Sequence, residues 1–185
     1  CVTVDNLVGM RLVMEHLFEL GHRRIAFVSG PLNSLLNHQR HLAYRLALME
    51  QGLPVDSRLI KVDPNWILNQ EQSHRDCVRF WDELFGLEDP PTAIAAAMDG
   101  FAAQMVRIAS EKGVLVPSRL SITGFGDMQY TAFTDPPITT VRVDHRAIGE
   151  LGALALLGMI DGATAPSQVA IRPSLVVRGS TGKCP

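Results

Sequence analysis

The stretch RIAFVSGP, residues 24–31, limits the architectures that this chain can adopt. The run from Arg24 to Val28 is almost continuously apolar, which is typical of a strand buried on both faces of a parallel sheet. Ser29, Gly30 and Pro31 end this strand with residues that favour turns. Because parallel neighbours need long crossover connections, the stretch predicts helices on either side of it in the sequence.

Short β-branched runs alternate with longer helical segments along the rest of the chain. Strands are expected near residues 2–4, 24–28, 59–62, 92–97, 120–124, 139–143 and 169–177. Helices are expected near 7–20 after an Asn6 cap, 34–51, 69–85, 99–112 with Asp99 as the cap, and 145–160. This alternation predicts an α/β fold with right-handed crossovers and a mainly parallel sheet covered by helices on both faces.

Composition excludes several classes of protein. The 185 residues predict one domain or a domain and a fraction, and 17 basic against 19 acidic residues leave no basic block with which to grip nucleic acid. Three cysteines favour a reducing compartment, and we expect a cytoplasmic location. There is neither an apolar run of membrane-spanning length nor a signal peptide. The start CVTVDN is typical of the middle of a gene product, so we treat the chain as a fragment.

The ends of the predicted strands carry the candidate site. In parallel α/β sheets, ligands bind at the carboxyl ends of the strands. The residues expected there are Asp5, Arg40, Trp66, Met98, Asp99, Gly126 and Asp127. Arginine offers a planar fork of donors, and tryptophan offers an apolar face for a ring. Together these residues predict a small-molecule site with few polar anchors on an apolar wall.

Each of these residues also has a plainer interpretation. Asp5 and Asp99 precede predicted helices, where an N-cap needs no further role. Trp66 could belong to the core, and Arg40 could be a solvated or salt-bridged helix residue. Gly126 and Asp127 could form a turn. Their shared position at one edge of the sheet favours the binding site over these alternatives.

Signals for other chemistry are weak. The chain has no glycine-rich phosphate-binding fingerprint and no G-x-S-x-G nucleophile elbow. His38 and His41 stand three residues apart, but no Cys or acidic partner follows at a telling spacing, so we predict neither a metal nor a cofactor. Without a nucleophile paired with a base, an enzyme on this fold is disfavoured.

The chain resembles the effector-binding domain of lactose-repressor (LacI/GalR) transcription regulators. The stretches that carry the resemblance are VDNLVG (4–9), HLFELGHRRIAFVSGP (16–31), R-x-x-A-Y-R-x-A-L (40–48), GLPVD (52–56), PPTAIAAAMD (90–99), VPSRLSITGFGD (116–127), PPITTVRVD (136–144) and LVVRGST (175–181). They follow one another in family order from one end of the chain to the other.

The resemblance implies a type I periplasmic-binding-protein-like sensor with two lobes. Residues 1–142 and 168–185 would form the C-terminal lobe, and 144–165 would be a helix of the N-terminal lobe, with crossovers near Val143 and Ser167. The family's DNA-reading helix-turn-helix is absent from this chain. The implied partners are a sugar or sugar-like effector, operator DNA and a second copy of the protein; the alternative is a periplasmic-type sugar-binding protein of a transport system.

The resemblance also adds site residues and a dimer interface. It implies effector contacts at His145 and Ile148, besides those at Arg40 and Trp66. It further implies that the helix 99–112 and the loop 128–134 lie between subunits, so that a charge at Val106 would give monomers.

Two positions depart from the family pattern. Met98 stands where the family usually has a ligand-bonding Asn, and Gly126 stands where it has a hydroxyl-binding Asp. Each lost buried hydrogen bond removes about 1–3 kcal/mol. We therefore expect a less hydroxylated or differently shaped effector, or a degraded pocket; micromolar binding of common free hexoses would contradict this.

Overall fold

A six-stranded sheet is the centre of the computed structural model, which describes residues 1–64, 66, 70–162 and 168–185. In order across the sheet, the strands are β3 (Ile60–Val62), β2 (Ile25–Ser29), β4 (Ala93–Ala96), β5 (Ser121–Gly126), β6 (Thr139–Arg142) and β8 (Ser174–Val176). All neighbours are parallel except β6 and β8. The predicted α/β class with a mainly parallel sheet is confirmed.

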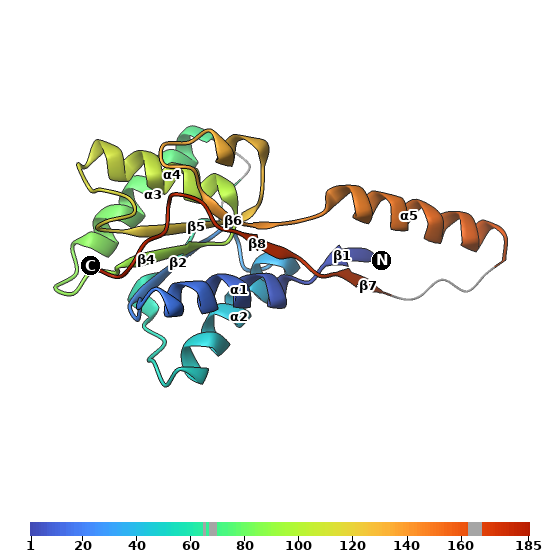
Figure 1. Cartoon of the computed structure of the whole chain (residues 1–185), viewed down its shortest axis with the longest axis horizontal. Helices are drawn as coiled ribbons and strands as arrows, with labels where there is room; N and C mark the ends of the chain where they lie inside the picture. Colours follow the sequence, from blue (N-terminus) through green and yellow to red (C-terminus); the bar gives the residue numbers. More distant parts are fainter. Residues whose placement is uncertain (65, 67–69, 163–167) are drawn as a thin grey trace.

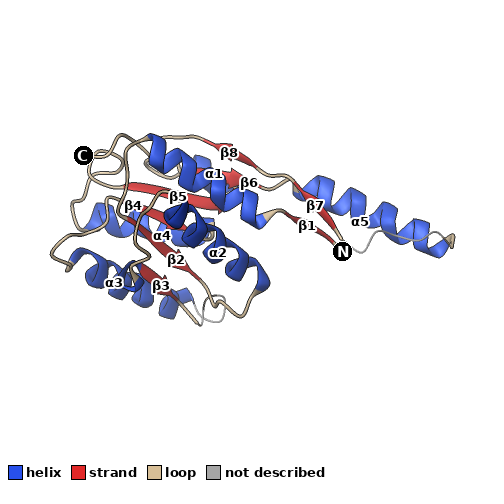
Figure 2. Ribbon diagram, turned by 90° about the horizontal axis from the view of Figure 1, so that it is seen from below, coloured by secondary structure: helices blue, strands red, loops and turns tan. Residues whose placement is uncertain are grey.

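Two pairs of helices cover the two faces of this sheet (Figures 1 and 2). They are α1 (Asn6–Glu19) with α2 (Leu35–Glu50), and α3 (Gln70–Phe85) with α4 (Asp99–Glu111). Successive residues of a strand point to opposite faces. Accordingly, Ile25 and Phe27 of β2 pack with α1 and α2, whereas Ala26 and Val28 pack with α3 and α4. Burial of both faces explains why β2 is apolar almost throughout.

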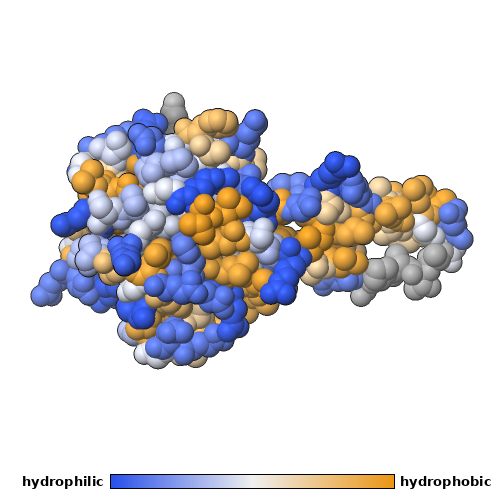
Figure 3. Space-filling view, viewed as in Figure 1, coloured by the Kyte–Doolittle hydropathy of each residue, from blue (hydrophilic) through white to orange (hydrophobic). Residues whose placement is uncertain are grey.

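A narrower arm extends from this body and consists of α5 (His145–Ile160), β1 (Val2–Val4) and β7 (Val169–Ile171). β1 and β7 pair in parallel with each other and not with the main sheet. No residue of α5 is buried, and apolar side chains lie openly along the arm (Figure 3). Among the described residues, no helix combines the length and the apolar character that crossing a bilayer requires.

Two predicted helix caps are corrected by the structure. Asp5, and not Asn6, caps α1, because its Oδ1 accepts a hydrogen bond from the backbone N–H of Val8 at 3.0 Å. Met98 occupies the N-cap position of α4, and Asp99 is the first helical residue. In both cases an aspartate and its neighbour compete for the cap, and tertiary contacts of the side chains decide which one takes it.

The predicted strand 169–177 is two strands, β7 and β8, separated at Arg172 and Pro173. Proline has no N–H to donate to a ladder, so a strand is interrupted there. The two halves join different sheets, with β7 beside β1 and β8 beside β6. The expected start of the third helix, Asn69, and the expected crossover at Ser167 lie outside the described residues.

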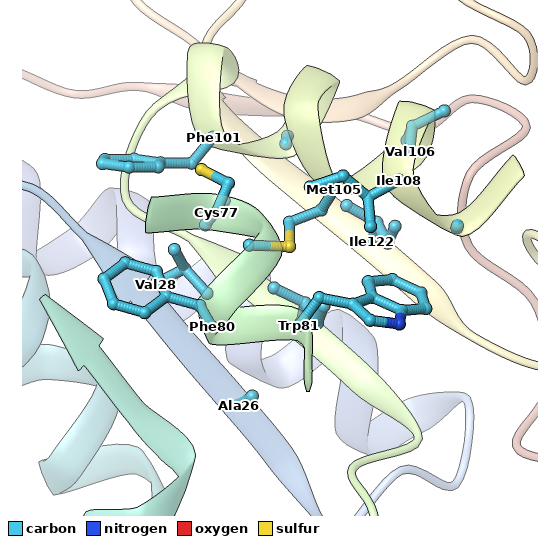
Figure 4. Close-up of a cluster of buried hydrophobic side chains, with 14 of the residues drawn as sticks. Ala26, Val28, Cys77, Phe80, Trp81, Phe101, Met105, Val106, Ile108 and Ile122 are labelled. Atoms are coloured by element: carbon cyan, nitrogen blue, oxygen red, sulfur yellow. The ribbon is translucent and has the colours of Figure 1, made fainter. Parts of the chain in front are cut away.

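The structure gives a charge at Val106 a second expected effect, the loss of stability, and the formation of monomers stays a prediction. Val106 is only 5% exposed and belongs to the core between α3, α4 and the sheet (Figure 4). A charge there tests the stability of the fold as well as the association of subunits.

His22 ties the C-terminal segment to the sheet. Its ring is fully buried, with Nδ1 2.9 Å from the hydroxyl of Thr92 and Nε2 2.9 Å from the hydroxyl of Ser121. Nε2 also lies 3.1 Å from the carbonyl oxygen of Gly182, which can only accept, so Nε2 carries the proton. Burial lowers the pKa of His22, against a smaller opposing effect of that carbonyl.

We expect the chain to lose stability as the pH falls below about 6.5, the ordinary pKa of histidine. Because burial lowers the pKa of His22 in the folded chain, the unfolded chain binds more protons in that range, and proton uptake favours unfolding. Thermal unfolding between pH 7.5 and about pH 5 measures the effect. His22→Gln should flatten the pH dependence, whereas His38→Gln on the exposed side of α2 should not. Equal pH profiles for wild type and His22→Gln would contradict this role.

Candidate functional site

A hollow of about 530 Å³ lies between the body and the arm. Seven of the predicted site residues line it: Arg40, Trp66, Met98, Asp99, Gly126, His145 and Ile148. They come from α2, from the segments that follow β3 and β4, from the last residue of β5, and from the start of α5. Arg40 and Trp66 therefore face the same space, as the proposed binding site requires.

Arg40 is the only buried cation of this wall in the described part of the chain. It is 7% exposed, and its guanidinium lies 3.6 Å from the centroid of the Phe125 ring. Its Nε donates to Oδ1 of Asn6 at 2.9 Å, and Nη1 donates to the carbonyl oxygen of Ala97 at 2.5 Å. These two hydrogen bonds fix the orientation of the guanidinium. Within the described residues, Nη2 of Arg40 donates no hydrogen bond. The interpretation of Arg40 as a solvated helix residue is wrong.

Burial lowers the pKa of Arg40 to about 10, although the negative charge of Asp99 acts in the opposite direction. The guanidinium therefore stays cationic at neutral pH. The guanidinium packs on the face of the Phe125 ring. Helix α1 approaches Phe125 so closely that a Cβ on Gly9 would lie 2.6 Å from the ring. Only glycine fits at that position without displacing the aromatic ring under the arginine.

Asp99 lines the hollow, but hydrogen bonds inside the protein occupy its carboxylate. Oδ1 accepts from the hydroxyl of Thr140 at 2.5 Å, and Oδ2 accepts from the backbone N–H of Met128 at 2.8 Å. Burial raises the pKa of Asp99, and these two hydrogen bonds oppose the increase. Asp99 thus anchors the loop after β5 to the start of α4.

Trp66 combines the two interpretations that the sequence left open. Its ring centroid lies 3.7 Å from that of Phe101, so the indole packs against the core. It also lines the hollow and covers the start of α4, where a Cβ on Gly100 would lie 2.6 Å from the indole. The indole of Trp66 is therefore in contact with Phe101 and Gly100 as well as with the hollow.

Asp5 and Asp127 do not line the hollow. Asp5 serves as the cap of α1. Asp127 lies in a left-handed turn with φ 54° and forms ion pairs with Arg142 and Arg178, both at 2.5 Å. Burial alone would raise the pKa of Asp127, but the hydrogen bonds from Arg178 and Arg142 outweigh it, and the pKa is below its usual value. Gly126 before it, with φ 135°, does reach the hollow.

Sequence reasoning missed several lining residues. Among them are Thr3 on β1, Leu36 on α2, Phe125 on β5 and Tyr130 after β5. Phe125 could have been found, because it directly precedes the strand end at Gly126. Nothing in the local sequence of Leu36 or Tyr130 marks these residues, since both reach the hollow through the tertiary arrangement.

A second hollow, of about 570 Å³, lies beside the first and shares Trp66, Gly100 and Tyr130 with it. Its other lining residues are Ser73, Ala103, Gln104 and Arg107 on α3 and α4. Arg40 is not among its described lining residues.

The first hollow combines a buried guanidinium with an apolar wall. Among the described residues, no hydrogen bond pairs His145 with a hydroxyl or thiol that it could activate. No group of three metal-ligating side chains occurs in the described ranges either. One guanidinium on an aromatic support, facing an apolar wall, can orient a small molecule.

Comparison with known proteins agrees with this arrangement. The family model of the periplasmic binding protein-like domain matches residues 14–181. The transcriptional repressor CytR of Escherichia coli K12 is 33% identical over 185 residues, which are 100% of this chain and 52% of that protein. The chain spans about half the length of the curated relatives it matches.

Solved structures give the same result. A LacI transcriptional regulator from Bacillus cereus subsp. cytotoxis NVH 391-98 superposes with a TM-score of 0.87 at 28% identity, covering 97% of this chain and 61% of that one. The lac repressor dimer, bound to operator and the anti-inducer ONPF, superposes with a TM-score of 0.85 at 26% identity over 98% of this chain and 60% of its own.

Proposed function

Since the chain belongs to the LacI family of regulators with a periplasmic binding protein-like sensor, we propose that it is the effector-binding and dimerisation part of a ligand-responsive transcription regulator. The observation that carries this proposal is the position of Arg40 and Trp66. Both line one hollow at the carboxyl ends of parallel strands, which is where ligands bind in such sheets.

The hollow also suggests how a ligand acts. It is lined by strand ends of the body and by Val143, His145 and Ile148 at the start of the arm. We assign the body to the C-terminal lobe of the sensor, and α5, within the segment 144–165, to the N-terminal lobe; residues 163–165 lie outside the described ranges. A small molecule between the lobes favours the lobe angle to which it binds better. A coupling of about 1–3 kcal/mol is typical of such switches.

The same proposal includes three partners of the intact protein: a small-molecule effector, operator DNA and a second copy of the protein. A homodimer would place two DNA-reading heads, which this chain does not contain, on half-sites about one helical turn apart in the cytoplasm. Exposed apolar residues beside α4 support a subunit interface there, since Phe133 is 81% exposed and Met128 and Tyr130 are also exposed. We place the interface on α4 and the loop 128–134.

A transport protein and an enzyme fit less well. The relatives compared above are named as transcriptional repressors and regulators, and not as components of a transport system. Within the described residues, the occupied carboxylate of Asp99 and the unpaired His145 give no catalytic arrangement.

DNA binding tests the proposal. The intact protein that contains this chain should select a palindromic sequence from random DNA, and its affinity should change when a ligand of the sensor is added. Fluorescence anisotropy of the selected duplex measures both the sequence preference and the change in affinity when ligand is added. If the intact protein shows no sequence preference at physiological salt, the regulator proposal is wrong.

A further inference from the structure

We propose that the effector is a small monocarboxylic acid with a flat apolar body, whose carboxylate binds Nη2 of Arg40. The inference names the ligand class of the hollow and rests on the proposed effector role of that hollow. Three features of the wall carry it: a cation without a direct ion pair, a shortage of acceptors, and extended apolar faces.

The first feature is that Arg40 has no direct ion pair within the described residues, although the negative charge of Asp99 acts on it from the same wall. The side chain is buried, yet it forms no ion pair with any described residue. A buried charge without an ionic partner is unfavourable, and an ion that enters the hollow relieves the cost. The hydrogen bonds of Nε and Nη1 hold the fork in place, so that Nη2 can donate to an incoming oxygen.

The second feature is the shortage of hydrogen-bond acceptors. Asp99 is the only carboxylate among the described lining residues, and Thr140 and Met128 already donate to its two oxygens. At positions 98 and 126 the wall presents a methionine and a glycine, neither of which offers a side-chain oxygen. The other described side-chain groups of the wall that can accept are the hydroxyls of Thr3 and Tyr130 and the ring of His145, so a ligand rich in hydroxyl groups would bury more O–H donors than these can satisfy, which is unfavourable. A carboxylate consists of acceptors only and does not meet this difficulty.

The third feature is the apolar surface around the cation. The indole of Trp66 and the side chains of Met98, Val143 and Ile148 line the same hollow as Arg40. Trp66 packs against Phe101, with ring centroids 3.7 Å apart. A flat ring gains most from a fixed aromatic face, because little side-chain entropy is lost on binding. The hollow thus matches a carboxylate on an aromatic body better than a polar ring.

Matched pairs of acid and amide test the charge requirement without altering the protein. Benzoate and phenylacetate are compared with benzamide and phenylacetamide, and with glucose, by isothermal titration calorimetry on the full chain at pH 7. We expect each acid to bind about 10- to 100-fold more tightly than its amide, the range expected for a charge-assisted hydrogen bond. Equal affinity of acid and amide, tighter binding of glucose, or no binding by either acid overturns the inference.

Variants locate the contact. Arg40→Gln should remove the preference for acid over amide, and Arg40→Lys should keep part of it because the charge remains. Arg45→Gln, the same change on the exposed side of α2, should leave the preference intact. If Arg40→Gln does not fold, the acid–amide ratio on the unchanged chain still decides. A preference that survives Arg40→Gln places the anion elsewhere and overturns the inference.

The ligand class and the regulator proposal fail independently. Selection of a DNA sequence by the intact protein does not depend on which probe binds. If that selection succeeds and the acids fail, only the ligand class is wrong. If the acids bind and no DNA sequence is selected, the hollow is an anion site in a protein that is not a regulator.

Discussion

The variant Val106→Glu is expected to lose most of its free energy of unfolding at 25 °C. Val106 lies inside the apolar layer of α3, α4 and the sheet, where Met105, Ile108 and Ile122 are also buried (Figure 4). A carboxylate in such a layer has no partner, and the penalty for a buried unpaired ion is several kcal/mol. Native domains are stable by only about 5–15 kcal/mol, so most of the stability is removed.

Circular dichroism during thermal unfolding measures this loss, and sedimentation of any folded material measures association. The control is Arg107→Glu, one residue further along α4, which introduces the same side chain at an exposed position. Within the described part of the chain, Arg107 forms one ion pair, which is exposed and joins its Nε to Oε1 of Glu111 at 2.8 Å, so the change in stability should stay below about 1 kcal/mol. If α4 lies in the dimer interface, Arg107→Glu gives folded monomers. A folded, monomeric Val106→Glu protein would instead show that residue 106 faces the partner.

The second large effect is expected for Asp99→Ala. This change leaves the N–H of Met128 and the hydroxyl of Thr140 without their acceptor, and Thr140 is fully buried. Each unsatisfied buried group costs about 1–3 kcal/mol, so the loss of two acceptors should destabilise the variant by about 2–6 kcal/mol. The loop after β5 should also loosen, which near-UV circular dichroism can follow through Tyr130.

Asp99→Asn is the matched variant. The amide keeps one oxygen for the N–H of Met128 and can donate its Nδ2 hydrogen to the hydroxyl of Thr140. We therefore expect Asp99→Asn to recover more than half of the stability that Asp99→Ala loses, as measured by denaturant unfolding. Equal destabilisation of both variants would show that the negative charge itself, and not the hydrogen bonds, holds Asp99 in place.

This distinction affects how the site is understood. An aspartate in a hollow beside an arginine suggests a ligand contact, yet the structure engages both of its oxygens in the protein. Arg40, by contrast, has a helix position that suggests a solvated residue, and it is the group that retains a donor for a ligand. The roles of these two residues follow from their hydrogen-bond partners and not from their residue types.

The local sequence pattern was enough to predict where most of the helices and strands begin and end. Apolar runs such as Ile25–Ser29 and helices closed by Gly21, Gly52 and Gly113 were placed to within about two residues, because strand and helix periods are local properties. The cap at Met98 was not, because distant partners, Met128 and Thr140, hold the side chain of Asp99. The division of residues 169–177 was missed although Pro173 marks it locally.

By itself, the sequence determined the α/β class, the order of its elements, the family, and the edge of the sheet where the hollow lies. Only the tertiary structure decided that β1 pairs with β7 outside the main sheet, that both oxygens of Asp99 accept hydrogen bonds from the protein, and that Arg40 lacks a direct ion pair among the described residues. The physical reason is the range of the forces involved. Periodicity and turn chemistry act over a few residues, whereas hydrogen-bond saturation and charge pairing depend on groups that meet only when distant segments pack.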